Sequence, residues 1–109
     1  MITRETLELA ALAAGIRLEW DGPPDQWQPM YYEGKTYRWF SPHTDPGDAA
    51  RLADKLLMYV DSRGTAVQAR VVDGEWHRIG RDGNPNAWCE AVVLCAAAVG
   101  ERMRKGGAR

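Results

Sequence analysis

The sequence predicts an α/β fold of the α+β type, in which a small, mostly antiparallel sheet of about four strands carries helices on both faces. Three observations predict it. Apolar residues recur at helical spacing in three segments, two hairpin-like segments lie between them, and the order along the chain is α-ββ-α-ββ-α. A chain of 109 residues is the size of one domain. We assign the sandwich domain to residues 1–103 and expect residues 104–109 to form a flexible basic tail.

The first element is a helix near the N-terminus. Thr3 is a suitable N-cap, leucine and alanine then recur at helical spacing, and Gly15 is a natural stop. Residues 19–29 are dense in proline, glycine and aspartate, which is typical of a loop. We expect Trp20 and Trp27 to pack and hold this loop in place.

A first β-hairpin is predicted from two short aromatic runs on either side of Gly34. Alternation places Tyr37 and Trp39 on one face of the second run, and Arg38 and Phe40 on the other.

The polar cluster around His43 begins the second helix. Asp45 precedes Pro46, and Asp48 lies three residues further on, so the pair fits an N-cap followed by an acidic first turn. The apolar face then comprises Ala49, Leu52, Ala53, Leu56, Leu57 and Val60. An alternative makes His43 and Asp45 metal ligands or an acid/base pair, but their spacing is not that of zinc or EF-hand sites. We therefore expect no metal site.

A second hairpin is predicted around Asp73-Gly74, one of the strongest hairpin turn signals. Before it, Val67 and Ala69 alternate with Gln68 and Arg70.

The last helix is apolar nearly all round over residues 87–99, so it must be covered on several sides, and it is expected to end near residues 100–103. Its apolar run is about half of the roughly 20 residues that cross a bilayer. The N-terminus lacks the basic and apolar regions of a signal peptide. We expect a cytosolic protein that does not enter a membrane.

Catalytic signatures are scarce in this sequence. It contains no glycine-rich phosphate loop, no nucleophile elbow and no HExxH motif. Cys89 and Cys95 lie six residues apart, which on a helix prevents a disulfide, and a cytosolic setting keeps them as thiols. One enzymatic alternative uses Cys89 as a nucleophile and His77, oriented by Glu75, as its base. The prediction is a protein without catalytic residues or cofactors.

Five tryptophans are many for so short a chain, and tryptophan is enriched in cores and at binding hot spots. Trp76 is the best candidate for an exposed binding residue because four arginines surround it in the sequence, namely Arg63, Arg70, Arg78 and Arg81. Such a surface would receive an acidic partner or single-stranded nucleic acid. The alternative is a charged solvent face over a covered sheet. The net charge of −1 gives nucleic-acid binding no support.

Three sequence stretches carry a resemblance to a known family: SPHTD, AARLADKL and AWCEAVVLCAA. Together with the hairpin between them they cover residues 31–99, and this pattern resembles the phage ABA sandwich domain of small phage and prophage proteins. The resemblance implies a layered α/β/α domain, a mobile-element origin and no established activity. It implies no catalytic residues.

From these observations we expect a phage or prophage accessory protein in the cytoplasm of a bacterial host. It would be a non-enzymatic interaction protein that binds a host or phage macromolecule, and an unknown host or phage protein is the expected partner. A nucleic-acid-binding module that uses the second hairpin and a small enzyme that uses Cys89 and His77 are the alternatives. A homodimer is left open, since it would cover an exposed strand edge or Trp76.

Overall fold

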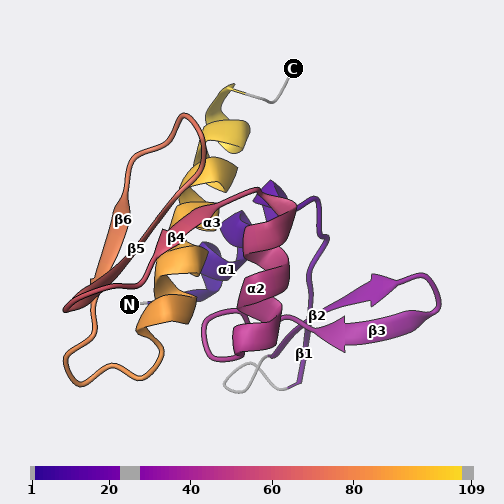
Figure 1. Ribbon diagram of the computed structural model, residues 1–109. Coiled ribbons are helices and arrows are strands. Elements are labelled where there is room, and N and C mark those ends of the chain that lie inside the picture. The colour runs from indigo at the N-terminus through magenta and orange to yellow at the C-terminus, as the bar shows by residue number, and fades with distance from the viewer. Residues whose placement is uncertain (1, 23–27, 107–109) are drawn as a thin grey trace.

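The computed structural model describes residues 2–22 and 28–106, which form an α+β domain (Figure 1). Trp27, which was expected to pack, lies outside the described residues. The helices are α1 (Arg4–Ala13), α2 (Pro46–Lys55) and α3 (Ala87–Gly106). The first sheet comprises β1 (Glu19–Asp21), β2 (Gln28–Glu33) and β3 (Thr36–Trp39). The second comprises β4 (Tyr59–Asp61), β5 (Ala66–Arg70) and β6 (His77–Gly80).

The prediction of one sheet of about four strands is wrong, because the described strands form two separate antiparallel sheets of three strands each. Each predicted hairpin gains one short strand that precedes it, β1 in the first sheet and β4 in the second. The observed order is therefore α-βββ-α-βββ-α rather than α-ββ-α-ββ-α. Strands of three residues are too short to show a period, so the sequence pattern did not reveal them.

Helix α3 is the central element of the fold. It packs along β5 and β6 on one side and against α1 and α2 on the other. Figure 1 shows the β4–β5–β6 sheet beside α3, and no helix of the described chain lies on the other face of that sheet. The expected cover of helices on both faces is thus not formed. The β2–β3 hairpin extends away from the helices on the opposite side of the molecule.

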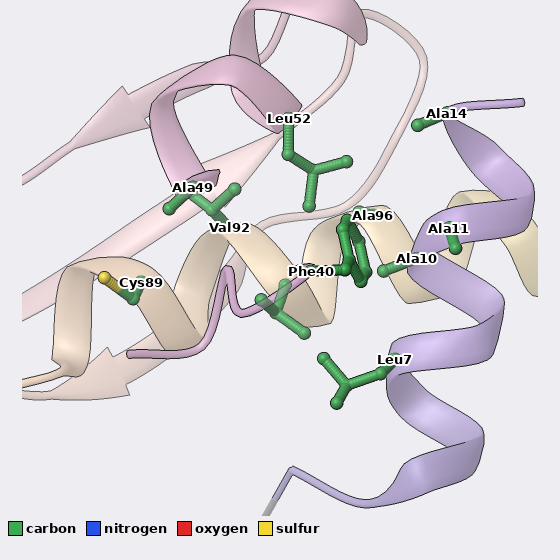
Figure 2. Close-up of a cluster of buried hydrophobic side chains, with 11 residues drawn as sticks. Leu7, Ala10, Ala11, Ala14, Phe40, Ala49, Leu52, Cys89, Val92 and Ala96 are labelled. Atoms are coloured by element: carbon green, nitrogen blue, oxygen red, sulfur yellow. The ribbon is translucent and has the colours of Figure 1, made fainter. Parts of the chain in front are cut away.

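Two clusters of buried side chains meet on α3, which explains why its sequence is apolar nearly all round. The first joins α3 to α1 and α2, and it includes Leu7, Ala10, Phe40, Leu52, Cys89, Val92, Val93 and Ala96 (Figure 2). The second joins α3 to the β4–β5–β6 sheet and comprises Val67, Ala69, Ala87, Ala91 and Cys95. Both cysteines are free and buried, one in each cluster.

Phe40 brings the first sheet to the helical core. It follows β3, its backbone N–H donates to the Pro29 carbonyl oxygen at 3.0 Å, and its ring lies edge-on to Tyr31 at 6.2 Å between centroids. Figure 2 shows the ring among side chains of α1, α2 and α3. On the same hairpin, Tyr37 and Trp39 are in edge contact at 5.8 Å, so they share one face as the alternation predicted. All four residues of β3 are exposed.

Helices α1 and α3 approach each other very closely at Gly100. A β-carbon built on Gly100 would lie 1.9 Å from the backbone oxygen of Leu9. Only glycine has no atom there, so the absence of a side chain sets the distance between the two helices.

The starts of α1 and α2 agree with the sequence prediction. Thr3 caps α1 by accepting the Thr6 N–H at 3.2 Å. Asp45 caps α2 by accepting the Gly47 N–H at 3.2 Å, and Pro46 is the first helical residue. The Asp48 carboxylate accepts the backbone N–H of Ser41 at 2.9 Å, which ties the preceding loop to the helix. The polar cluster therefore begins a helix, as expected.

The end of α2 differs from the prediction. The apolar spacing continued to Val60, but the helix ends at Lys55 and Val60 belongs to β4. Leu57 takes a left-handed backbone angle, with φ of 52°, and its side chain is 74% exposed. The periodicity was misleading because Val60 packs into the core from a strand.

Helix α3 ends later than predicted, at Gly106, so residues 104–106 are helical rather than part of a flexible tail. The last turn is stabilised by the ion pairs of Glu101 with Arg104, at 2.6 Å, and with Lys105, at 3.4 Å. The two cations also lie at the negative end of the helix dipole. Residues 107–109 of the predicted tail lie outside the described residues.

Candidate functional site

The face of the β4–β5–β6 sheet that points away from α3 is the candidate site. Strand alternation sends Val60, Val67 and Ala69 toward α3. The alternate positions then form the opposite face, which we call the outer face: Tyr59, Asp61, Gln68, Arg70, Trp76 and Arg78. Three of the five predicted binding residues, Trp76, Arg70 and Arg78, are therefore on one surface.

Arg70 lies between two aromatic rings on this face. Its guanidinium carbon is 5.4 Å from the ring centroid of Tyr59 and 5.1 Å from that of Trp76. Both contacts are within the range of cation–π interactions. The rings remain half-exposed, at 55% for Tyr59 and 46% for Trp76. Together with residues 60–63 they line a shallow cavity of about 540 Å³.

Trp76 reaches this position because the β5–β6 connection is longer than a tight turn. The Asp73-Gly74 signal does mark a turn, in which the Gly74 N–H donates to the Val71 carbonyl oxygen at 3.0 Å. The first ladder pair beyond it, however, is Ala69 with His77. Residues 71–76 thus form a loop that places Trp76 just before β6, beside Arg70.

A second, polar cavity of about 270 Å³ adjoins the first. Its lining comprises Arg63, Thr65, Ala66, Gln68 and Arg78, and Arg63 lines both cavities. The Arg63 guanidinium forms an ion pair with Asp61 at 3.1 Å. Hydrogen bonds from the side chain and backbone of Arg63 lower the pKa of the Asp61 carboxyl, so this carboxylate stays charged and orients the arginine.

Arg81, the fifth of the predicted binding residues, forms hydrogen bonds to the backbone between β4 and β5. Its guanidinium donates to the Ser62 carbonyl oxygen, and its backbone N–H donates to the Thr65 carbonyl oxygen at 2.9 Å. Arg81 therefore ties the end of β6 to the β4–β5 loop, which also carries Arg63.

The enzymatic alternative requires Cys89 beside His77. The structure places Cys89 in the first buried cluster and His77 at a cavity of about 410 Å³ lined by Val71, Cys95 and Arg102, among others. Burial raises the pKa of both the Cys89 and the Cys95 thiols, which favours the unreactive protonated form. The two cysteines thus have the environment of core residues.

Both histidines resist protonation in the folded chain. Burial lowers the pKa of His43, against the opposing charge of Glu90, and its Nδ1 is buried without a hydrogen-bond partner among the described residues. Burial also lowers the pKa of His77, where Arg102 lowers it further and Glu75 raises it.

The free energy of unfolding is therefore expected to fall as the pH falls through the range below about 7, near the ordinary histidine pKa. In the unfolded chain the imidazoles bind protons more readily, so the stability contributed by their neutral forms is complete above that pKa and is lost as pH falls through the lowered folded values. Urea titrations across this range should show a smaller pH dependence for a His43→Gln, His77→Gln double variant. An equal dependence would contradict the expectation.

The described residues contain no group of three or more histidine, cysteine, aspartate or glutamate side chains arranged to hold a metal ion. His43 and Asp45 thus have no third ligand there, and Asp45 is the N-cap of α2.

A further cavity of about 530 Å³, which no pattern in the sequence indicated, lies between the end of α1, strand β2 and helix α2. Tyr31, Phe40 and Leu52 contribute its apolar wall. Two of its acidic groups already have cationic partners, since Asp48 pairs with Arg51 and Glu33 pairs with Arg38 at 3.3 Å. The cavity lining carries charges of both signs.

Tyr59, Asp61 and Gln68 are the residues of the outer face that were not predicted from the sequence as site residues. A signal for Tyr59 was present, because Met58 and Val60 point inward while Tyr59 and Asp61 alternate with them. The helical reading of residues 49–60 obscured this alternation.

The fold and the site thus define a small α+β domain with one sheet face that carries aromatic rings and arginines. No family model, curated protein or solved structure matches the chain. Among the described residues, every helix is too short or too polar to cross a bilayer.

Proposed function

We propose that the protein is a non-enzymatic binding protein whose outer face receives an anionic macromolecule. The observation that carries the proposal is the position of Arg70 between Tyr59 and Trp76, beside the cavity lined by Arg63 and Arg78. Aromatic and arginine side chains are the types that dominate binding energy at interfaces.

Charge on this surface favours an anionic partner. The outer face and its polar cavity carry three arginines, Arg63, Arg70 and Arg78, and Asp61 is the carboxylate that pairs with Arg63. The whole chain, by contrast, has a net charge of −1. The local excess of positive charge therefore does not extend over the molecule, and it would steer an acidic partner to this face.

The phage or prophage origin and the bacterial cytoplasm remain predictions that rest on the resemblance and on the sequence. If they hold, the partner is a host or phage macromolecule. The proposal for the outer face does not depend on them, since it rests on the side chains of one sheet.

The test measures binding of two anionic probes, polyglutamate and single-stranded oligothymidine, at low salt. We expect at least one probe to bind, and an Arg63→Ala, Arg78→Ala variant to lose most of that binding. The matched control is Arg17→Ala, Arg38→Ala, which removes the same charge from exposed positions outside the β4–β5–β6 sheet. No binding of either probe, or equal loss in both variants, would contradict the proposal.

Turnover of a small substrate that is lost on changing His77 or Cys89 would contradict the non-enzymatic part of the proposal.

A further inference from the structure

The two cavities of the outer face are adjacent and differ in chemistry. The larger one is lined by the rings of Tyr59 and Trp76, and the smaller one by Arg78, Gln68 and Thr65. Arg63 lines both, so a single ligand that enters one cavity also meets the other. An aromatic cavity beside an arginine cavity suits a ligand that alternates planar rings with negative charges.

The aromatic cavity has the features of a stacking site. Arg70 contacts the rings of Tyr59 and Trp76 and so restricts their orientation. Because Tyr59 and Trp76 are each about half exposed, they remain accessible to a ligand. A nucleobase stacks on such rings whatever its identity, since every base has a planar π-face.

The arginine cavity has the features of a phosphate site. Arg63 and Arg78 supply planar guanidinium groups, which recognise phosphate by paired hydrogen bonds. Gln68 and Thr65 add neutral side-chain donors to the same lining. Asp61 holds Arg63 in place and is the carboxylate with which a phosphate would compete.

We propose that the outer face binds single-stranded nucleic acid, with a base on Tyr59 and Trp76 and the adjacent phosphates on Arg63 and Arg78. This inference rests on the proposed function and specifies its partner. An acidic peptide would use the arginines but would leave the aromatic cavity without a planar group to stack. A duplex presents phosphates and keeps its bases paired, so it too would leave the rings unused.

The first experiment measures binding of a labelled oligothymidine of about eight nucleotides, a length within the range that small single-strand-binding domains cover. Fluorescence anisotropy at several salt concentrations gives the affinity and its salt dependence. If two phosphates are neutralised, the logarithm of the binding constant should fall with a slope of about −1.4 against the logarithm of salt concentration. The Arg63→Ala, Arg78→Ala variant should lose most of this slope.

A second set of variants tests stacking separately from charge. Trp76→Ala is expected to weaken oligothymidine binding by about 5-fold to 150-fold, and Trp76→Phe should retain most of the affinity. Trp39→Ala is the matched control, because Trp39 is similarly exposed on the other sheet. Circular dichroism tests whether each variant is folded. If Trp76→Ala does not fold, Trp76→Phe still tests whether an aromatic ring at this position is enough for binding.

Two further probes test whether the ligand is a single strand, a free nucleotide or a duplex, all of which carry bases and phosphates. Thymidine monophosphate should bind much more weakly than the oligomer, whereas equal affinity would overturn the single-strand assignment in favour of a nucleotide site. Duplex DNA of the same length should bind more weakly than the single strand, and the reverse order would also overturn it.

The outcomes separate this inference from the proposed function. Binding of polyglutamate without binding of oligothymidine would overturn the nucleic-acid assignment and leave an anion-binding face. If Trp76→Ala binds oligothymidine as tightly as the unchanged protein does, the proposal that a base stacks on Trp76 is likewise overturned. Failure of every anionic probe would reject both proposals.

Discussion

Replacing Gly100 by alanine is expected to lower the free energy of unfolding by about 3 kcal/mol or more, at the upper end of overpacking effects. The new β-carbon would lie 1.9 Å from the Leu9 backbone oxygen and 2.7 Å from its carbonyl carbon. Backbone atoms of a packed helix cannot move aside as a flexible side chain does. Helices α1 and α3 would have to separate, and the first buried cluster would lose contacts along its length.

The measurement is urea unfolding of the two proteins at the same pH. Gly106→Ala is the matched control, since Gly106 is also in α3 but has nothing within 4 Å of the built β-carbon. That change is expected to be neutral or to stabilise by up to about 1 kcal/mol, because alanine is the better helix former. Similar effects of the two substitutions would show that the close helix contact is absent in solution.

Replacing Phe40 by alanine is expected to cost about 3–5 kcal/mol, the range observed when a buried aromatic side chain is removed. Phe40 is 3% exposed and lies among side chains of all three helices. Its removal would leave a cavity, and the ring of Tyr31 would lose its edge-on contact with Phe40. A domain of this size is stable by only about 5–15 kcal/mol, so the loss should be easy to detect.

The control for this prediction is Tyr37→Ala on the same hairpin. Tyr37 is exposed and contacts Trp39, so its removal is expected to cost about 1 kcal/mol or less. Thermal unfolding of both variants gives the comparison. A loss for Phe40→Ala no larger than that for Tyr37→Ala would contradict the buried position of Phe40.

Elements with strong local signals were predictable from the sequence. The N-caps at Thr3 and Asp45 were predicted because a side-chain oxygen precedes the first free backbone N–H groups of each helix. The central place of α3 was predictable because residues 87–99 have no polar face, and a helix of that kind must be covered on several sides.

The division into two sheets was not predictable in the same way. Strands β1 and β4 depend on pairing with β2 and β5, which neighbour them only after the chain has folded back. Propensity and periodicity describe the segment alone, whereas pairing depends on the tertiary structure. The end of α2 shows the same limit, because Leu56 and Val60 are both partly buried but belong to different kinds of structure.

The candidate site was predicted in part. Trp76 and Arg70 were predicted to lie near each other in the second hairpin. In the structure the guanidinium carbon of Arg70 is 5.1 Å from the centroid of the Trp76 ring. Arg81 was predicted as a binding residue because it is an arginine near Trp76 in the sequence. Its contact with Ser62 could not be inferred, because it joins positions that are distant in sequence. Tyr59 was missed because the interpretation of residues 49–60 as a helix concealed strand β4, from which Tyr59 comes.

The contact of Leu9 with Gly100 also bears on when the protein can fold during its synthesis. Helix α1 leaves the ribosome before α3, yet the surface that it packs against is supplied by α3, roughly the last fifth of the described chain. Contacts between segments so far apart in sequence form slowly, since a long loop must close before they stabilise the fold. In the nascent chain, α1 therefore lacks its packing partner until α3 has emerged. During this interval the apolar face of α1 is exposed and can bind chaperones or misassemble.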